Sequence, residues 1–99
     1  MSNGVAKIGN NAFSKCVSIE SITIPNSVTK IGNNAFNGCS NLQNIYVTAI
    51  APPAGAAGMF TNVSSLLKIY VPQDALGTYK TTNYWKNYAD KIVGYDFGE

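Results

Sequence analysis

The sequence predicts an α/β repeat solenoid, in which stacked coils of the chain each supply one short parallel strand and a helical cap closes the C-terminal end. Three observations predict it. One heptapeptide occurs twice, at residues 7–13 and 30–36. Apolar residues flank both copies at an offset of 23, and a blurred third copy follows at an offset of 24. A period in the twenties with apolar residues at fixed phases is typical of stacked coils, because one coil alone cannot bury its apolar face.

At 99 residues the chain is long enough for one structural domain. We divide it into coils over residues 4–71, two regular and one divergent, and a cap over residues 72–99. The charged fraction is only 12% and the apolar fraction 45%, which argues against disorder. A net charge of +2 from scattered lysines gives no basic stripe, so we expect no nucleic-acid partner. No apolar run approaches the roughly 20 residues that span a bilayer, so we expect no membrane insertion by this chain.

The first coil begins with a turn and a short helical or 3₁₀ segment. Gly9 is expected to provide the positive φ or the close backbone approach of a turn. We expect Asn10-Asn11, and their copies Asn33-Asn34, to cap the helical turn that follows, and not to bind a ligand. Apolar residues three apart then share one buried face, and in the first coil these are Phe13, Cys16 and Ile19.

Each coil then continues into a strand. Ile22 and Ile24 alternate with Ser21 and Thr23, which is the period-two pattern of a strand with one buried face. The copies of this pattern predict three parallel strands side by side, at residues 22–24, 45–47 and 69–71.

The third coil departs from the regular pattern. A Pro-Pro segment and a loop of small residues occupy residues 49–58, where the heptapeptide would otherwise recur. We interpret this segment as a tapered last coil, with a functional loop as the alternative. The predicted interior of this coil consists of Met59, Phe60, Val63, Leu66, Ile69 and Val71.

A cap follows the third coil. Asp74 is a plausible helix N-cap, and the residues at 81–83 predict a break between two short helices. Residues 92–97 are expected to form a short strand or an extended tail. We expect Tyr84, Trp85 and Tyr88 to form the core of the cap, with a sugar-stacking platform as the alternative. The first coil has no such cover, so we expect further repeats or a partner, including a second copy of the chain, at that end.

The repeated motif resembles that of the BspA-like leucine-rich repeat family of bacterial surface proteins. It reads Ile-Gly-Asn-Asn-Ala-Phe, then Cys, then an aliphatic residue, then Ile-x-Ile-Pro, at residues 8–25 and again at 31–48 with Thr48 in place of proline. The segment from Pro52 to Ile92 resembles the closing module of such proteins. The resemblance implies a cell-surface or secreted location and binding to a protein or glycan on a host or bacterial surface. It implies no particular binding residues.

Catalytic, metal and cofactor sites are not expected. Histidine is absent, which removes the commonest proton shuttle and metal ligand, and the five acidic residues are dispersed with no concave pocket implied. We therefore predict that the chain is not an enzyme and binds no cofactor or metal. Cys16 and Cys39 occupy the same phase of adjacent coils. We favour buried thiols, while a backbone separation of about 5 Å leaves a disulfide open.

The outward positions of the strands are the candidate partner-binding site. Thr23, Tyr46 and Tyr70 share one phase and are expected to form a row on the exposed face of the sheet. A second row is expected from Ser21, Asn44 and Lys68, with Glu20, Gln43 and Leu67 at its edge. Tyrosine offers a large contact area with a polar tip, which suits protein or glycan contact. The alternative is that these rings only stabilise the sheet.

The sequence therefore favours a non-catalytic binding or adhesion module that acts through the face of its sheet. The alternative function is a purely structural terminator that caps a longer repeat array.

Overall fold

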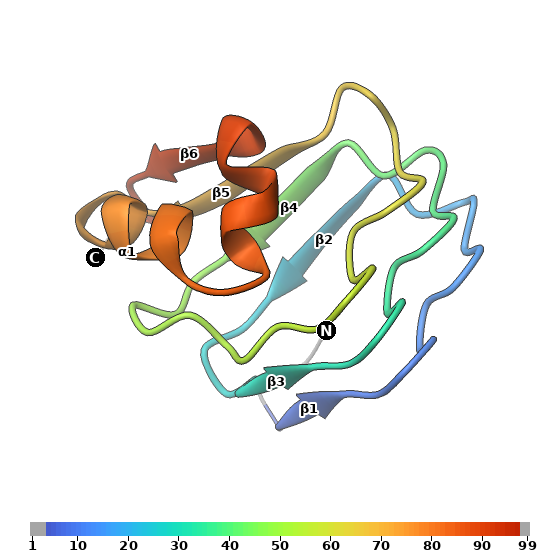
Figure 1. Ribbon diagram of the computed structural model, residues 1–99, viewed down its shortest axis with the longest axis horizontal. Helices are drawn as coiled ribbons and strands as arrows, with labels where there is room; N and C mark the ends of the chain where they lie inside the picture. Colours follow the sequence, from blue (N-terminus) through green and yellow to red (C-terminus); the bar gives the residue numbers. More distant parts are fainter. Residues whose placement is uncertain (1–3, 98–99) are drawn as a thin grey trace.

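The computed structural model describes residues 4–97. Two parallel sheets carry the repeats (Figure 1). The smaller sheet pairs β1 (Lys7–Ile8) with β3 (Lys30–Ile31). The larger sheet has the order β2 (Ser21–Ile24), β4 (Asn44–Val47), β5 (Lys68–Pro72) and β6 (Ile92–Tyr95). Each regular repeat thus contributes one strand to each sheet.

The strand register follows the sequence repeat. Ile22 pairs with Ile45, and Ile45 pairs with Ile69, all in parallel. The prediction of three parallel strands side by side is confirmed. The C-terminal segment forms a fourth strand, β6, which pairs in parallel with β5 and places Ile92 beside Ile69.

The segments between the strands of the two regular repeats are tight turns, so the predicted helical or 3₁₀ segment does not form as a continuous helix. Three amides donate to the carbonyl three residues back, as in 3₁₀-type turns: Ala12 to Gly9, Ser14 to Asn11 and Cys16 to Phe13. The amides between them instead reach the second repeat. Phe13 donates to the Ala35 carbonyl over 2.8 Å, and Lys15 donates to the Asn37 carbonyl over 2.8 Å. A continuous helix cannot form here because bonds between repeats use every second amide that a helix would need.

The asparagines of the heptapeptide shape these turns. Asn11 and Asn34 have φ values of 59° and 57°, a left-handed conformation that asparagine tolerates well. The Asn10 side-chain oxygen accepts from the Asn33 amide of the next repeat over 2.8 Å, so it does not cap a helix of its own repeat. Gly9 has neither a positive φ nor a neighbour within 4 Å of an added Cβ, so the prediction for it is wrong. Its copy Gly32 provides the close approach instead, because a Cβ there would lie 2.5 Å from the Asn10 side-chain oxygen.

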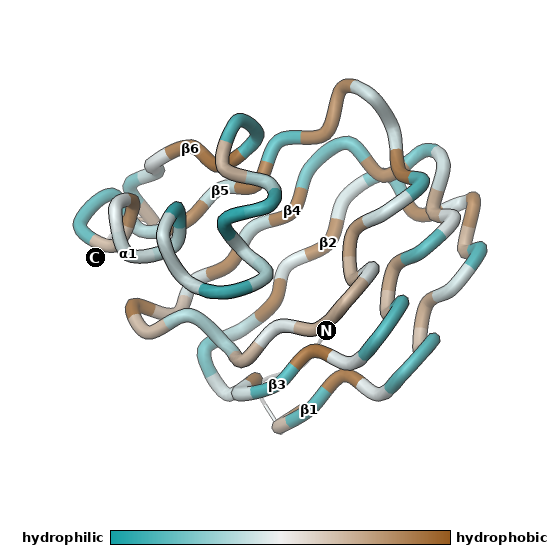
Figure 2. The backbone as a smooth tube through the Cα atoms, viewed as in Figure 1, coloured by the Kyte–Doolittle hydropathy of each residue, from teal (hydrophilic) through white to brown (hydrophobic). Residues whose placement is uncertain are grey.

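A stack of aromatic rings runs through the core. The centroids of Phe13 and Phe36 lie 5.2 Å apart, and those of Phe36 and Phe60 lie 5.6 Å apart. Ring contacts continue into the cap, where the Trp85 ring meets Phe60 edge-on with centroids 5.5 Å apart. Figure 2 shows hydrophobic positions recurring at the same places in successive repeats. The buried face of each repeat therefore packs against the same face of the next.

The third repeat buries a different leucine from the predicted one. Leu66 is 68% exposed, whereas Leu67 is 3% exposed. The Lys68 amide donates to the Gln43 carbonyl over 2.9 Å, which holds the following strand in register. The turn before that strand has its own shape in this divergent repeat, and it brings Leu67 inward. The expectations that Leu66 is interior and that Leu67 lies at the exposed edge are both wrong.

The cap covers the third repeat, at the opposite end of the stack from β1 (Figure 1). It consists of η1 (Gln73–Ala75), α1 (Leu76–Thr81) and η2 (Trp85–Lys91). The gap between α1 and η2 confirms the predicted break. None of the helices within residues 4–97 is long and apolar enough to span a membrane.

Asp74 does not cap a helix, contrary to the prediction. It lies inside η1, Pro72 occupies the N-cap position, and no side chain caps the first turn. The proline ends β5 and begins the 3₁₀ turn directly, because its fixed φ suits both conformations.

Two buried hydrogen bonds join the cap to the Pro-Pro segment of the third repeat. The Tyr79 hydroxyl donates to the Ala49 carbonyl over 2.5 Å, and the Trp85 indole donates to the Pro53 carbonyl over 2.8 Å. Both rings are fully buried. These two bonds therefore hold the backbone of the Pro-Pro segment against the cap.

Candidate functional site

The predicted row of outward residues exists on the four-stranded sheet. Tyr46 of β4 pairs with Thr23 of β2 on one side and with Tyr70 of β5 on the other. The rings of Tyr46 and Tyr70 are stacked, with centroids 4.8 Å apart and planes at 13°. Thr23 is exposed and both tyrosines are half-buried. These side chains lie side by side because the strands pair in parallel and in register.

Strand β6 adds two aromatic residues that the sequence reasoning did not include. Tyr95 meets Tyr70 edge-on at 5.4 Å and Tyr46 edge-on at 5.9 Å. Phe97 packs edge-on against Tyr95 at 4.8 Å. Tyr95 is 43% exposed. We call Tyr46, Tyr70 and Tyr95 the tyrosine cluster.

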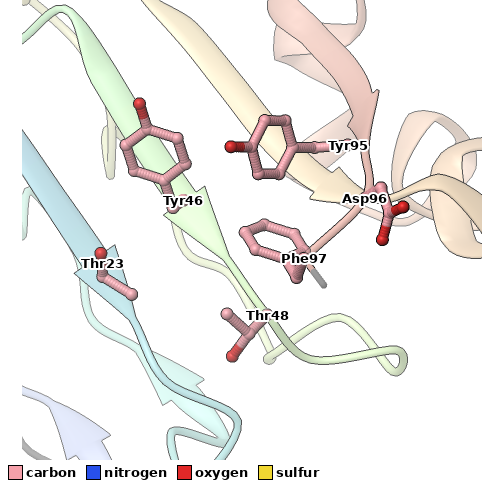
Figure 3. A pocket seen from close by; sticks show the side chains of 6 residues that line it. All are labelled: Thr23, Tyr46, Thr48, Tyr95, Asp96 and Phe97. Atoms are coloured by element: carbon pink, nitrogen blue, oxygen red, sulfur yellow. The ribbon is translucent and has the colours of Figure 1, made fainter. Parts of the chain in front are cut away.

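A first hollow, of about 480 Å³, lies beside the tyrosine cluster (Figure 3). Its lining comes from β2, from β4 and the residue after it, and from the C-terminal segment: Thr23, Tyr46, Thr48, Tyr95, Asp96 and Phe97. Figure 3 shows the Tyr95 and Phe97 rings on the side that faces β4, while the Asp96 carboxylate points away from Thr23 and Tyr46. Aromatic rings and hydroxyl groups thus dominate this part of the surface.

A second hollow, of about 680 Å³, adjoins the first and shares Thr48, Tyr95, Asp96 and Phe97 with it. Asp74 also lines it. The expectation that the acidic residues are dispersed with no shared pocket is therefore wrong for Asp74 and Asp96. The cause is the parallel return of β6, which places the end of the chain beside the start of η1, with Tyr95 paired to Pro72.

A third hollow, of about 420 Å³, lies along the Pro-Pro segment. It shares Asn26 and Ile50 with the second hollow. Ile50 is 64% exposed, and Pro52 and Pro53 continue the apolar wall. The residue types here favour contact with apolar groups.

The second predicted row is present but lines none of these hollows. Ser21 pairs with Asn44, and Asn44 pairs with Lys68, on the same outward face as the tyrosine cluster. Of the predicted edge residues, Glu20 and Gln43 are exposed, whereas Leu67 is buried.

The two cysteines are free thiols. Cys39 is buried, and its Sγ donates to the Phe13 carbonyl over 2.9 Å. Burial raises the pKa of the Cys39 thiol above its ordinary value. Cys16, in the first repeat, is half-buried. Within residues 4–97, no three His, Cys, Asp or Glu side chains are grouped closely enough to hold a metal ion.

The cap aromatics form a core, as the favoured interpretation predicted. Trp85 is fully buried and Tyr84 is half-buried. Tyr88 packs edge-on against Phe60 at 5.4 Å, and its hydroxyl oxygen accepts from the Phe60 amide over 3.3 Å. Trp85 cannot stack on a sugar from this position.

Sequence reasoning missed Thr48, Tyr95, Asp96 and Phe97 as site residues. A signal was present, because Val93, Tyr95 and Phe97 alternate with period two and would share one face of a strand. The strand does continue the offset of 23, since Ile92 lies beside Ile69. Residues 93–97, however, copy none of residues 70–74, so the sequence pattern alone did not reveal this register.

Stacked repeats, of which the two regular ones each supply a strand to both parallel sheets, define a repeat protein. Over residues 1–87 the sequence matches the family described as BspA type leucine rich repeat region (6 copies). The chain belongs to this family, which confirms the resemblance drawn from the repeated motif. A comparison with curated proteins found no match.

Proposed function

We propose that the protein is a non-catalytic binding module that acts at the cell surface through the outer face of its four-stranded sheet, on a protein or glycan partner. Members of its family are commonly surface-associated and involved in binding. The observation that carries the proposal is the tyrosine cluster, where stacked Tyr46 and Tyr70 meet the edge of Tyr95 beside an open hollow. Rings that hold one another lose little entropy when a partner covers them.

The acidic residues support a role without catalysis. Asp74 and Asp96 line one hollow, but both are exposed. A carboxyl that acts as a general acid is usually buried in an apolar pocket, which raises its pKa toward neutrality. Histidine is absent from the whole sequence.

The stacking supports a solenoid that further repeats can extend. The outer strand β2 and the smaller strand β1 leave one edge of each sheet without a paired strand among residues 4–97. Residues of the first repeat are also less buried than their copies. Phe13 and Ile22 are half-buried, whereas Phe36 and Ile45 are fully buried. We propose that this end also meets a second copy of the chain when no other repeat covers it.

The proposal is tested with glycan and host-protein arrays, probed with the wild-type chain and with a Tyr46→Ala, Tyr70→Ala double variant. We expect the wild type to bind at least one arrayed partner and the double variant to lose most of that binding. The fold should persist, at a cost of about 1 kcal/mol for the lost ring pair. Leu66→Ala is the control, because Leu66 is exposed and lies outside the hollows.

A structural terminator is the second candidate function. The cap favours it, because Trp85 and Tyr88 pack against Phe60, the last phenylalanine of the ring stack, and so close that end of the core. If the double variant is unfolded at the temperature of the binding assay, or if the arrays show no binding by the wild type, the tyrosines serve the sheet alone and this candidate stands.

A further inference from the structure

The three hollows adjoin one another near the carboxyl ends of the strands. The first and second hollows share Thr48 and Phe97, and the second and third share Asn26 and Ile50. We call this feature the end groove. We propose that it binds an extended peptide segment of a protein partner, in which a lysine or arginine lies close to an apolar residue. This inference rests on the proposed binding function and specifies its ligand.

Charge complementarity favours a cationic segment. Asp74 and Asp96 line the groove, and they are two of the four acidic residues within residues 4–97. None of the seven lysines of the chain lines any of the three hollows. A protein of net charge +2 thus places carboxylates, and no cations, along one groove. Such a groove raises the local concentration of positively charged groups and disfavours acidic ones.

The aromatic part of the groove suits the same cation. Tyr46, Tyr95 and Phe97 line the first hollow together (Figure 3). An ammonium or guanidinium group gains energy over an aromatic ring face, and an arginine side chain also stacks on it. The long methylene stem of either side chain can cover apolar ring surface in the first hollow while its charge reaches the second hollow, which Asp74 and Asp96 line.

The apolar part of the groove requires a second kind of side chain. Ile50 is 64% exposed between the second and third hollows. The backbone on either side of Ile50 is held by the cap, because the Tyr79 hydroxyl donates a hydrogen bond to the Ala49 carbonyl and the Trp85 indole donates one to the Pro53 carbonyl. A rigid, exposed aliphatic residue beside prolines is a ready contact for an apolar side chain of a partner.

A peptide fits this combination better than a glycan does. Sugar sites combine a stacking ring with several polar side chains that serve ring hydroxyls. The third hollow is instead mostly apolar, because Ile50, Pro52, Pro53, Val28 and two alanines outnumber Asn26 and Thr29 in its lining. Adjoining hollows with an acidic, aromatic part and an apolar part match a chain that carries different side chains at successive positions.

The test begins with a display library of random dodecapeptides, selected on the immobilised wild-type chain at low ionic strength. We expect the enriched sequences to contain lysine or arginine within a few positions of an aliphatic or aromatic residue. The most enriched peptide is then synthesised and titrated into ¹⁵N-labelled protein. The amide shifts should concentrate at Thr48, Ile50, Gln73, Tyr95 and Phe97, and added salt should weaken binding.

Matched variants separate the contributions. Asp74→Asn should weaken the affinity about fivefold, and Phe97→Ala about tenfold. Asp90→Asn and Leu66→Ala remove an equivalent charge and an equivalent exposed side chain outside the groove. Both controls should bind like the wild type.

Each contrary result is distinguishable. Enriched peptides without basic residues, or shifts confined to Ser21, Asn44 and Lys68, overturn the end-groove assignment and leave the sheet face as the binding surface. An absence of enrichment together with binding on a glycan array overturns the peptide but keeps the proposed function. If neither library binds, both the inference and the proposed function fail.

Discussion

The ring of Phe13 lies parallel to the ring of Phe36, with their planes at 6° and their centroids 5.2 Å apart, yet only Phe36 is fully buried. Phe36 has a repeat on both sides, whereas Phe13 has one on one side only. We therefore expect Phe36→Ala to lower the free energy of unfolding by about 3 to 5 kcal/mol, and Phe13→Ala by less than half as much. Urea denaturation of the two variants measures the difference, and equal losses would contradict the stacking order.

Gly32 and Gly9 are matched positions in adjacent repeats with different surroundings. A Cβ at Gly32 would lie 2.5 Å from the side-chain oxygen and 2.6 Å from the backbone nitrogen of Asn10, while a Cβ at Gly9 meets nothing within 4 Å. Gly32→Ala should therefore destabilise the protein by about 1 to 3 kcal/mol, with Gly9→Ala as a nearly neutral control. Thermal melts of both variants provide the comparison. A neutral Gly32→Ala would show that the repeats do not approach so closely.

Tyr79 makes the stability depend on alkaline pH. Burial raises the pKa of its hydroxyl well above the ordinary value, so the folded state holds the neutral phenol. The free energy of unfolding is therefore unaffected by this group below the unfolded pKa of about 10. Between the unfolded and the folded pKa it falls by about 1.4 kcal/mol per pH unit, because only the unfolded state loses the proton. Tyr79→Phe should flatten this decline, measured by urea denaturation at successive pH values.

The same variant tests the hydrogen bond of Tyr79 to the Ala49 carbonyl. At neutral pH, Tyr79→Phe leaves that buried carbonyl without its donor and should cost about 1 to 3 kcal/mol. An unchanged stability at neutral pH, or an unchanged slope at alkaline pH, would mean that the hydroxyl is not held as described.

The two thiols should differ in reactivity. Cys39 is buried and its pKa is raised, while Cys16 is half-buried in the first repeat. Because the thiolate is the reactive form, a thiol reagent at a pH of about 8 should modify Cys16 much faster than Cys39. Mass spectrometry of the partly modified protein identifies the site. Cys16→Ser should leave a single slow reaction that accelerates in denaturant, and equal rates in the native protein would refute the difference in burial.

The open edge of the first repeat should support self-association. Strand β2 is an edge strand, and Ile22 on it is only half-buried. Sedimentation of the chain should give a mass near twice 10.5 kDa at high concentration. Ile22→Lys should restore the monomer, since a charge on an edge strand opposes pairing. Circular dichroism would verify that this variant is folded. A wild-type mass of 10.5 kDa at every concentration would argue against a second copy at this edge.

Much of the fold follows from one property of the sequence, the copy of each repeat in the next. An offset of 23 that preserves Ile22, Phe13 and Cys16 as Ile45, Phe36 and Cys39 requires equivalent positions to lie side by side, and the structure has them so. The row of Thr23, Tyr46 and Tyr70 could be predicted for the same reason.

Where the copies end, the predictions became less accurate. The divergent third repeat buries Leu67 in place of Leu66, because the shape of an irregular turn depends on contacts with its neighbours and not on its phase. Asp74 has the chemistry of an N-cap, but Pro72 starts the first helical turn of the cap. The turns of residues 9–16 have helical spacing, yet every second amide in them bonds to the next repeat.

The amino-acid sequence by itself determined the stacking, the parallel register and the tyrosine row. When repeats stack in register, equivalent residues of successive repeats become neighbours. Only the tertiary structure decided that β6 returns beside β5 and brings Tyr95, Asp96 and Phe97 to the row and to Asp74. That placement depends on how the cap packs over Phe60 and the Pro-Pro segment, through contacts between residues about 25 to 32 positions apart that no repeat encodes.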